Sequence, residues 1–439
     1  MTEREIIERV KTLDGIKELN PMQLKVLGSS ARQLILISPT GSGKTIAFGM
    51  RILRSLRESG DGLQALILAP SRELVIQIVS VMRQLCRGYK TVAFYGGHSV
   101  ADEKASLSPV PDIIVATPGR FLDHLQRGNL VAERALRSVV LDEYDKSLQL
   151  GFEGEMKRIM RRIGAPSNLT MTSATMLSSF PDYINAANAE IIESLPQDNS
   201  GKLEVVSVES FSRDKLDSLV GLLLSMSPGE KAIVFVNHRE SADRIRERLR
   251  KEHIMAGLYH GALDQQQRST AVDLFANGTT PVLVATDLAA RGLDITGLDA
   301  VVHYHLPVDE ATWTHRNGRT ARQEASGRVY VITSEADNLA PYIRFDRSYQ
   351  PPMDGSRPPV SGVATLHISA GRKEKISRGD VLGYVMKNSE LTSGEVGKIN
   401  IYDHYSLVAV PRESVGGLLG TLNANKLKGK RVRVTEVKS

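Results

Sequence analysis

The sequence predicts an α/β protein with two tandem, doubly wound parallel-sheet domains, followed by a small α+β domain of βαββαβ order. Three observations support this fold class. Short continuous apolar runs alternate with helical patterns in two successive regions, as expected for parallel strands that are buried on both faces. Polar stretches containing Pro or Gly separate the regions. The last 79 residues return to shorter elements of mixed type and carry a surplus of positive charge.

The first region covers residues 1–200. Its apolar or β-branched runs have strand length, and helical patterns such as 72–86 lie between them. A polar stretch, 196–202, follows as a linker. The predicted strands are 34–37, 66–68, 112–116, 139–141 and 169–172.

The same pattern restarts over residues 205–345, which predicts a second domain of the same class. A Pro-, Gly- and Ser-rich stretch at 346–361 then has the composition of a second linker. The predicted strands of this region are 232–236, 282–285, 301–304 and 329–332.

The last region, 362–439, predicts a strand, a helix, a strand pair, a helix and a final strand. This βαββαβ order is the one used by RNA-recognition modules. The aromatic signature of the standard module is absent, because 406–410 is aliphatic where stacking rings are expected. The elements are 363–368, 377–386, 398–402 with 406–410, 414–423 and 430–434.

Charge is unevenly distributed along the chain. From residue 361 onward there are 13 Lys and Arg against 7 Asp and Glu, so this region holds the whole net charge of +6. The first 360 residues balance at 43 and 43. A basic module beside a neutral body favours binding to a polyanion, because neutralised phosphates give affinity that does not depend on sequence. An ordinary solvated surface is the alternative.

Composition places the chain among soluble globular proteins, with 41% hydrophobic and 24% charged residues. A single cysteine, Cys86, excludes a disulfide framework and fits a reducing cytosol. No apolar run approaches the ~18 residues that span a membrane. We therefore expect a cytoplasmic monomer with no membrane contact.

A glycine-rich turn follows the first predicted strand. Small residues there let backbone N–H groups close around phosphate oxygens at a helix start. Lys44 would reach the β- and γ-phosphates, and the Thr45 hydroxyl would ligate Mg²⁺. The strict pattern has glycine at the first position, where this chain has Ser38. The predicted phosphate-binding residues are Ser38, Pro39, Thr40, Gly41, Ser42, Gly43, Lys44 and Thr45.

Two further elements belong with this turn. Asp142 and Glu143 follow a strand, at the end where open α/β sheets bind ligands. Asp142 would hold Mg²⁺, and Glu143 would orient the attacking water. Far downstream, Arg319 and Arg322 are spaced to reach a phosphate. Because these arginines lie in the second domain, they would complete the site only when the two domains close.

This set of motifs resembles the DEAD-box RNA helicases, in family order over about the first 345 residues. The triplet 21–23 is similar to the adenine-reading motif, with Gln23 as the reader. The other matching motifs are Ser38–Thr45, 69–74, Gly96 with Gly97, 117–120, 142–145, 173–175, 234–237, His260 with Gly261, Gln265 and Arg268, 285–294 and 315–322.

The resemblance implies two RecA-like domains and an RNA-dependent ATPase. It implies that Arg319 and Arg322 act as arginine fingers and that Asp287 contacts the ribose. His315 would link the γ-phosphate side to Ser173 and Thr175, which couple ATP to RNA. The residues that would line the RNA backbone are Pro70, Arg72, Gly97, Thr117, Arg120, Arg268, Thr286 and Arg291.

The last region resembles the C-terminal domain of the DbpA subfamily, through 367–376 and 397–403. That subfamily is bacterial, and the resemblance implies a grip on a hairpin of large-subunit ribosomal RNA, with pre-ribosomal particles as partners. The expected RNA contacts of the tail are Arg372, Lys373, Lys375, Lys398, Tyr402 and Tyr405.

Three residues depart from the family pattern. Tyr144 replaces the alanine of D-E-A-D and is expected to add bulk beside the carboxylates. Ala321 stands where glycine is usual, and Ile6 stands where an aromatic residue would stack on adenine. Two main hypotheses remain: an ATP-dependent RNA helicase acting in large-subunit assembly, or an ATP-locked RNA clamp with little turnover. A DNA helicase is a third reading, which the core motifs alone leave open.

Overall fold

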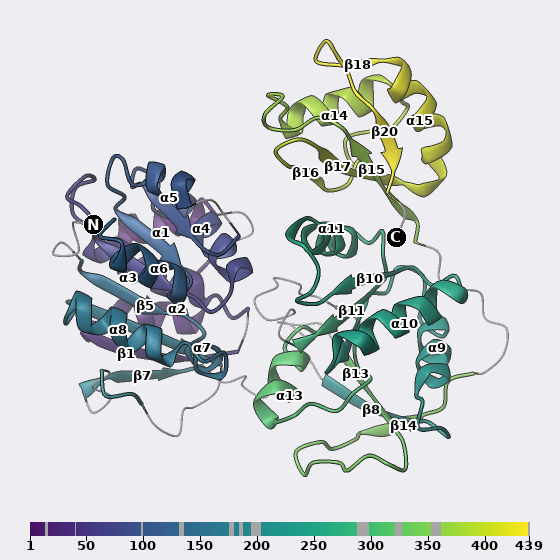
Figure 1. The fold of residues 1–439 in the computed structure, drawn as a ribbon, viewed down its shortest axis with the longest axis horizontal. Coiled ribbons are helices and arrows are strands. Elements are labelled where there is room, and N and C mark those ends of the chain that lie inside the picture. Colours follow the sequence, from purple (N-terminus) through teal and green to yellow (C-terminus); the bar gives the residue numbers. More distant parts are fainter. Residues whose placement is uncertain are drawn as a thin grey trace. The chain divides into compact units, whose positions relative to one another are not determined.

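The computed structural model describes residues 1–13, 16–39, 41–97, 100–130, 136–174, 180–183, 188–194, 203–287, 298–320, 327–352 and 361–437 (Figure 1). The described residues form two compact units, one within residues 1–199 and the other within residues 200–439. The expected linker at 196–202 and the stretch 353–360 of the second linker lie outside the described residues.

The first unit contains a parallel sheet of seven strands in the order β3-β4-β2-β5-β6-β1-β7, which confirms the predicted doubly wound class. Crossover helices connect the strands, as parallel neighbours require. The strands are β1 (Gln33–Ile37), β2 (Ala65–Leu68), β3 (Thr91–Phe94), β4 (Ile113–Ala116), β5 (Ser138–Leu141), β6 (Asn168–Ser173) and β7 (Glu190–Glu193).

The helices of this unit begin at recognisable caps. Asn20 and Gln23 form a reciprocal capping box at α2. The Ser71 hydroxyl accepts the Leu74 N–H at the start of α4. The helices are α1 (Glu3–Lys11), α2 (Pro21–Gly28), α3 (Lys44–Ser55), α4 (Arg72–Leu85), α5 (Val100–Ser106), α6 (Pro118–Gln126), α7 (Tyr144–Gln149) and α8 (Glu153–Ile163).

The strand order brings the expected nucleotide motifs to one edge of the sheet. β5, β6 and β1 are neighbours, with Leu141 opposite Met171 and Ile37 opposite Ser173. All three strands end at the same edge, because they are parallel. The phosphate-binding turn, Asp142 and Ser173 therefore lie together at the carboxyl edge, where such sheets bind ligands.

The second unit begins with another parallel sheet of seven strands, in the order β10-β11-β9-β12-β13-β8-β14. β14 pairs with β8 and ends at Tyr349, so this sheet extends into the stretch that composition marks as linker. The strands are β8 (Leu203–Glu209), β9 (Ala232–Val236), β10 (Ala256–Tyr259), β11 (Val282–Thr286), β12 (Ala300–His303), β13 (Gly327–Thr333) and β14 (Arg347–Tyr349).

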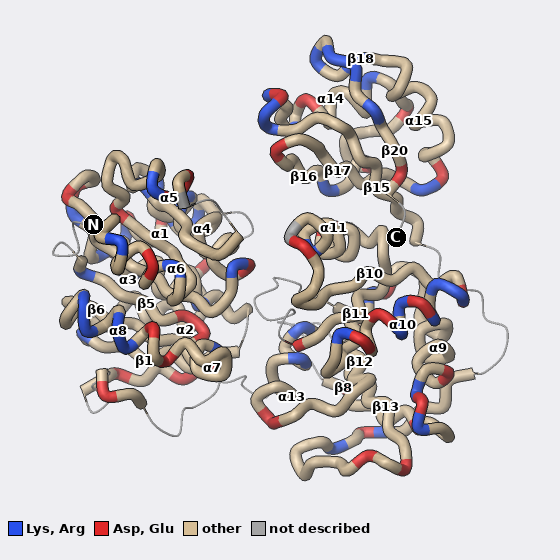
Figure 2. The backbone as a smooth tube through the Cα atoms, in the orientation of Figure 1, with Lys and Arg blue, Asp and Glu red and all other residues tan. Residues whose placement is uncertain are grey.

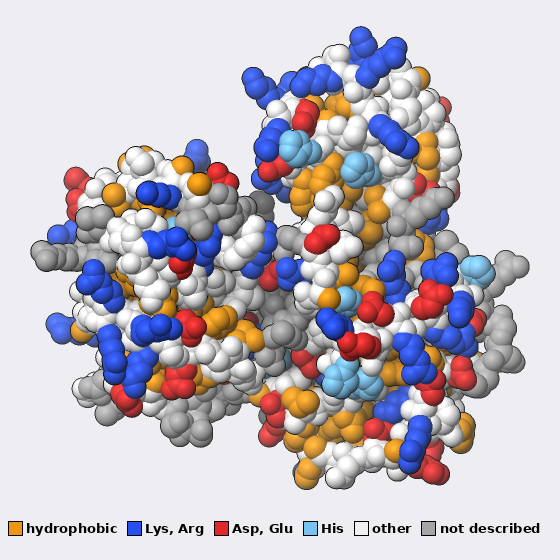
Figure 3. Space-filling view, viewed as in Figure 1, with side chains coloured by type: hydrophobic (Ala, Val, Ile, Leu, Met, Phe, Trp, Pro, Cys, Tyr) orange, Lys and Arg blue, Asp and Glu red, His pale blue; other side chains and the backbone are white. Residues whose placement is uncertain are grey.

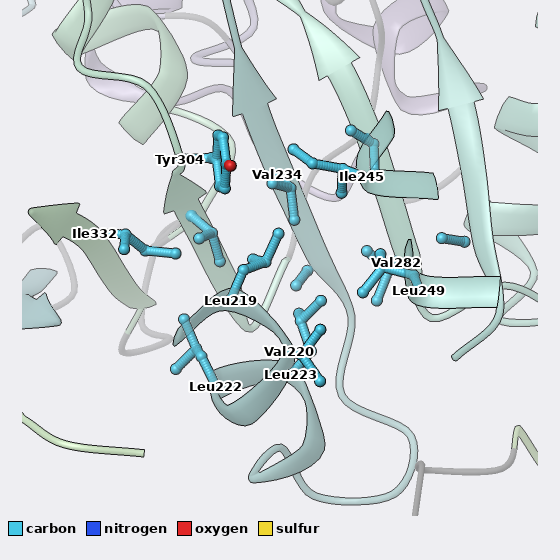
Figure 4. Packing of buried hydrophobic residues seen from close by; sticks show 14 of the residues in the cluster. Leu219, Val220, Leu222, Leu223, Val234, Ile245, Leu249, Val282, Tyr304 and Ile332 are labelled. Carbon is cyan, nitrogen blue, oxygen red and sulfur yellow. The ribbon is translucent and has the colours of Figure 1, made fainter. Parts of the chain in front are cut away.

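Four described helices accompany this second sheet. Leu219, Val220 and Leu223 of α9 pack with Val234 and Val282 of the sheet and with side chains of α10 (Figure 4). The mostly apolar sequence of α9, in which Asp217 and Ser218 are the polar residues, fits this burial. The helices are α9 (Leu216–Leu224), α10 (Arg239–Lys251), α11 (Gln265–Ala276) and α13 (Glu310–Asn317).

The tail of the second unit has a four-stranded antiparallel sheet in the order β16-β17-β15-β20, as the βαββαβ prediction requires. The helices α14 and α15 contribute to one core with this sheet. The elements are β15 (Val363–Ile368), α14 (Arg378–Lys387), β16 (Ile399–Ile401), β17 (Ser406–Pro411), a short 3₁₀ turn (Arg412–Ser414), α15 (Val415–Ala424) and β20 (Val434–Glu436).

The predicted last strand, 430–434, is wrong in one respect. Its first residues form β19 (Lys430–Arg431), which pairs with β18 (Lys426–Leu427) in a separate hairpin. Lys428 and Gly429 between them both have positive φ, 52° and 81°, as a two-residue hairpin turn requires. Only the residues from Val434 onward join the main sheet.

None of the helices that the structure describes is both long enough and apolar enough to cross a membrane.

Candidate nucleotide and RNA sites

The phosphate-binding turn has the backbone that its glycines predict. Gly41 and Gly43 have φ of 78° and 88°, in the left-handed region that favours glycine. A Cβ on Gly43 would lie 2.4 Å from Nε2 of Gln23, so a larger residue would have to displace the Gln23 amide. Lys44 is buried, and its Nζ donates to the carbonyl of Ser38 at 2.6 Å. Burial lowers the pKa of Lys44, and the nearby carboxylates oppose that shift.

The helix α2 carries Gln23, the residue expected to recognise adenine, and is hydrogen-bonded to the phosphate-binding turn. The amide oxygen of Gln23 accepts the Asn20 N–H at 3.0 Å, and its Nε2 donates to the Gly43 carbonyl at 3.3 Å. Asn20 also donates from Nδ2 to the Ser42 carbonyl at 2.9 Å. The sequence analysis missed Asn20, although the N-x-x-Q capping pattern was a usable signal. Ile6 is fully buried in the hydrophobic core.

The two carboxylates lie at the end of β5 in a buried polar cluster. Asp142 Oδ1 accepts the hydroxyl of Thr172 at 2.5 Å, and the Thr172 oxygen accepts the Glu143 N–H at 3.1 Å. Lys146, which is fully buried, forms an ion pair with Glu143 at 2.8 Å. Glu143 is the N-cap of α7 and has a left-handed backbone, with φ of 47°. The sequence analysis missed Thr172 and Lys146, whose roles depend on tertiary contacts.

The residues present fit a divalent cation bound with phosphate oxygens. Burial and the charge of Glu143 raise the pKa of Asp142 to about 6, and a cation would offset that cost. Within the described part of the chain, no group of three His, Cys, Asp or Glu side chains could hold a metal alone. Mg²⁺ commonly binds through one or two carboxylates and substrate phosphates, so this sparse donor set suits it. The buried hydroxyls of Ser38 and Ser42 also have no partner among the described residues, which fits a polar ligand beside the turn.

Tyr144 does not crowd the carboxylates. Its ring is fully buried in the hydrophobic cluster beneath β5 and β6, and its hydroxyl lies 2.7 Å from that of Tyr183. Burial, followed by this hydrogen bond, raises the pKa of Tyr144 far above its usual range. The expectation of bulk beside the site is therefore wrong, because the side chain points into the core.

Several expected RNA contacts lie beyond the ends of β2 and β3, at the same edge of the first sheet. The Arg72 guanidinium lies over the Tyr95 ring, 4.7 Å from its centroid, and donates to the Gly96 carbonyl at 3.4 Å. A Cβ on Gly97 would come within 2.6 Å of Arg72 Nη1, so the glycine permits this placement. Pro70 is buried just before α4.

Thr117 and Arg120 follow β4, the strand between β3 and β2. Thr117 is the N-cap of α6, and Arg120 Nε donates to Glu103 Oε2 at 2.6 Å. The same carboxylate oxygen lies 2.8 Å from Nε2 of the fully buried His124. Burial by itself would raise the pKa of Glu103, but the hydrogen bonds with His124 and Arg120 together lower it below its usual value. Glu103 and His124 thus hold Arg120 in place, and neither was singled out from the sequence.

In the second unit, Asp287 lies against an arginine. Arg316 donates from Nε and Nη2 to the two carboxylate oxygens of Asp287, both at 2.6 Å. Its other amino group donates to the His305 carbonyl at 2.7 Å. Burial and the Arg316 charge lower the pKa of His303 to about 3, so this histidine is neutral. Arg316 is thus the organising residue of this edge, and the sequence analysis gave it no separate role.

The other residues expected at the sites of the second helicase domain also have defined places. His315 lies in the last turn of α13 and Arg319 follows the helix, and both are buried. Thr286 ends β11, and Arg268 lies on α11. Four residues expected at these sites lie outside the described residues, namely Thr40, Thr175, Arg291 and Arg322.

The expected tail contacts fall into two groups. Arg372, Lys373 and Lys375 are exposed on the turn between β15 and α14, beside the β18–β19 hairpin, since Lys428 donates to the Lys375 carbonyl at 3.1 Å. Lys and Arg residues gather at this end of the tail (Figures 2 and 3). Tyr402 and Tyr405 instead stack on each other at 4.5 Å between ring centroids, and Lys398 lies 3.9 Å from Asp273.

Comparisons with known families agree with the division of the chain into two parallel-sheet domains and a tail. The model described as DEAD/DEAH box helicase matches residues 20–182, and that described as helicase conserved C-terminal domain matches 214–324. The model described as DbpA RNA binding domain matches residues 365–436. Together these matches cover both parallel sheets and the tail.

Similar proteins include the ATP-dependent RNA helicase DbpA of Escherichia coli, 34% identical over 97% of this chain and 95% of the relative. The ATP-dependent rRNA helicase RRP3 of Eremothecium gossypii is 32% identical over 85% of this chain and 81% of the relative. Among solved structures, Saccharomyces cerevisiae Dbp5 bound to RNA and ADP BeF3 has a TM-score of 0.65 and 27% identity, over 75% of this chain and 87% of that one. The chain therefore belongs to the DEAD-box ATP-dependent RNA helicases that carry a DbpA-type RNA-binding domain.

Proposed function

We propose that this helicase uses ATP hydrolysis to open short RNA duplexes in ribosomal RNA during assembly of the large ribosomal subunit. The observation that carries the proposal is the buried cluster of Asp142, Glu143, Thr172 and Lys146 beside the phosphate-binding turn. Buried charges are costly unless they are paired or used, and clusters of perturbed groups favour functional sites. In this proposal residues 1–200 and 205–345, together with β14 at 347–349, form the motor. The rest of 346–361 is the linker, and 362–439 is the RNA grip.

The residues divide the chemistry among them. Lys44 would neutralise phosphate charge. Asp142 and Thr45 would hold Mg²⁺, which would supply further positive charge to the phosphates. Glu143 orients the attacking water and accepts its proton. Lys146 fixes the Glu143 carboxylate through the ion pair at 2.8 Å, so the general base is already held in position before the reaction.

The second domain would contribute the charge that stabilises the transition state. Arg319, Arg322 and His315 would approach the γ-phosphate when ATP and RNA favour a closed arrangement. An arginine in this role supplies ~10³–10⁵ in rate. RNA would lie along the edge that carries Arg72, Arg120 and their neighbours, where most contacts reach phosphate and sugar, so the motor itself would not read sequence.

Specificity for ribosomal RNA would come from the tail. The DbpA-type domain and the charge of +6 concentrated there support this assignment. Relatives named as rRNA helicases support the ribosomal target. The partners implied are large-subunit ribosomal RNA and pre-ribosomal particles.

The test compares RNA-stimulated phosphate release by the wild type and by Glu143→Gln. We expect turnover in the wild type and its near-complete loss in the variant, with ATP still bound. Equal, near-zero rates in both would favour the ATP-locked clamp. Truncation after Pro352, which keeps β14 in the motor, should erase any preference for ribosomal over random RNA and leave ATPase activity on generic RNA. A truncated motor that keeps the preference would show that the tail is not its source.

A further inference from the structure

A cavity of about 230 Å³ lies at the amino edge of the first sheet, where β5, β6 and β1 begin. Arg51 and Arg54 of α3 line it, together with the polar side chains of Ser29, Ser30 and Asn168. The phosphate-binding turn is at the other end of the same helix, which begins at Lys44. Ten residues of helix separate Lys44 from Arg54, which is ~15 Å along the axis. The cavity is therefore distinct from the nucleotide site.

Arg51 is a buried cation in the wall of this cavity, with only 6% of its surface exposed. Its Nε donates to the Thr170 hydroxyl at 3.1 Å. Its two amino groups donate to the Ser29 hydroxyl oxygen at 3.4 Å and to the Ala31 carbonyl at 2.7 Å. A guanidinium has five N–H donors, so one on each amino nitrogen is unused among the described residues. These two N–H groups remain for a ligand.

Arg54 adds a second cation to the same wall. Its amino groups donate to the carbonyls of Leu27 and Ser29, at the end of α2. Such bonds cap a helix, which is a structural role for Arg54. Capping does not explain why a second arginine is buried beside the first and next to a cavity.

The cavity has positive charge without a carboxylate partner. Within the described part of the chain, neither arginine forms an ion pair. The nearby carboxylate of Glu190 is exposed and accepts the Ser29 hydroxyl at 2.6 Å. Burial, followed by the charge of Arg54, lowers the pKa of Arg51 to about 10, and Glu190 opposes this shift only in part. A bound anion would offset the cost of burying this charge.

Further arginines lie along the same edge of the sheet. Arg32 and Arg137 directly precede β1 and β5. Their carbonyls accept the N–H groups of Leu169 and Asn168, both at 2.8 Å, so the two arginines flank the start of β6. Figure 2 shows more Lys and Arg beside β6 and α8, and the last turn of α8 carries Arg161 and Arg162. Several cations along one edge suit a polyanion with repeated phosphates, more than a single small anion.

We infer that this cavity binds a phosphate of an RNA backbone and gives the motor a second RNA contact, at the edge of the first sheet opposite its expected RNA path. The guanidinium groups of Arg51 and Arg54 suit phosphate oxygens, and Ser30 and Asn168 can donate further hydrogen bonds. A short strand on the expected path would not extend to this edge, whereas a long folded RNA can contact both. Because phosphate carries no sequence information, the inference does not rest on the ribosomal target.

Two variants of the full-length protein test the cavity, because each places a carboxylate in it. In Ser30→Asp and Asn168→Asp the replaced side chain has no hydrogen-bond partner among the described residues, so neither change removes one. The new carboxylate would pair with the arginines and exclude phosphate. Without RNA, we expect Tm to rise by about 2–4 °C in each variant. Ser80→Asp, at an exposed serine of α4 that does not line the cavity, is the matched control and should not raise Tm.

Binding of fragmented large-subunit ribosomal RNA tests the identity of the ligand. Both variants should raise its Kd roughly tenfold and lower the slope of log K against log salt by about 1, while the control changes neither. A single strand of about ten nucleotides, which fits the motor's path alone, should keep its Kd. An unchanged Kd for the long RNA in both variants would overturn the inference, even where Tm rises. An equal loss for the short strand would also overturn it, since the substitutions would then disturb the motor's own path.

Modification of Arg32 by phenylglyoxal, followed by peptide mass, locates the contact directly. Arg32 is exposed and borders the cavity. The long RNA should protect it, whereas the short strand should not. Inorganic phosphate is the second probe, and protection by phosphate without protection by RNA would indicate an adventitious ion only and reject the RNA contact. Long random RNA should protect Arg32 as well as ribosomal RNA does. Equal wild-type affinity for these two RNAs would contradict the proposed ribosomal target and leave the cavity's role standing.

Discussion

Replacing Asp142 by asparagine should abolish ATP hydrolysis and also stabilise the ligand-free protein. Burial and the adjacent Glu143 charge raise the pKa of Asp142 from 3.8 to about 6. Each unit of pKa corresponds to about 1.4 kcal/mol, so the ionised carboxylate costs roughly 3 kcal/mol at neutral pH. Asparagine has no charge to bury, and its amide oxygen can still accept the Thr172 hydroxyl.

The sign of the pH dependence follows from the direction of the shift. Because the pKa is higher in the folded chain, the folded state keeps its proton over pH values at which the unfolded state has lost it. The cost is absent below about pH 4, grows as the pH rises toward about 6, and then stays constant. The advantage of Asp142→Asn should therefore be roughly 3 kcal/mol at pH 8 and about half as large at pH 5.

Thermal unfolding of the full-length protein at these two pH values measures the effect. For a unit of this size, about 2–4 °C per kcal/mol gives a rise in Tm of roughly 6–12 °C at pH 8 and about half of that at pH 5. Asp112→Asn is the matched control in the same unit. Asp112 accepts hydrogen bonds from Ser59, Gly60 and Lys90, so losing its charge should lower Tm. An equal advantage at both pH values, or none at pH 8, would refute the reasoning.

Three further predictions concern the same unit and its proposed partner arginine. Tyr183→Phe should cost about 1–3 kcal/mol of stability, because the buried Tyr144 hydroxyl loses its partner; the double variant with Tyr144→Phe should recover much of this in chemical denaturation. Gly43→Ala should lower ATP affinity at least tenfold in nucleotide titrations, since its Cβ would meet Gln23 at 2.4 Å and its φ is strained; unchanged affinity would contradict the turn geometry. Arg319→Ala should bind ATP normally but slow single-turnover hydrolysis by ~10³ or more. Weakened binding with normal chemistry would reject that role.

Much of the fold and of the nucleotide site could be predicted because the signals are local. The phosphate-binding turn is specified by a strand and the glycine-rich residues that follow it directly. The position of the two carboxylates is likewise specified by the strand that they follow. Thr172 and Lys146 could not be predicted, because a threonine inside a strand and a lysine on a short helix gain their roles only from neighbours in space. Tyr144 shows the same limit, since the direction of its ring depends on space in the core.

The tail shows how a local signal can be misread. The alternation at 430–434 is typical of one strand, yet the positive φ of Lys428 and Gly429 turns the chain back so that β19 pairs with β18. The Lys-Gly pair was the available signal for this turn. Nothing near Tyr402 in the sequence indicates Asp273, which lies 129 residues away and meets it only in the folded unit.

The hydrogen bonds of Gln23 have a consequence for the choice of base. A glutamine amide offers two donors and two lone pairs, and capping α2 and bonding Gly43 use one of each. These two hydrogen bonds also fix the orientation of the Gln23 amide, because exchanging its oxygen and nitrogen would break both of them. One N–H and one lone pair remain, which match the acceptor and donor that adenine presents at N7 and N6. Guanine presents two acceptors there, and one would face the amide oxygen. Discrimination against GTP would thus be determined by hydrogen bonds within the protein, which orient the Gln23 amide independently of the nucleotide.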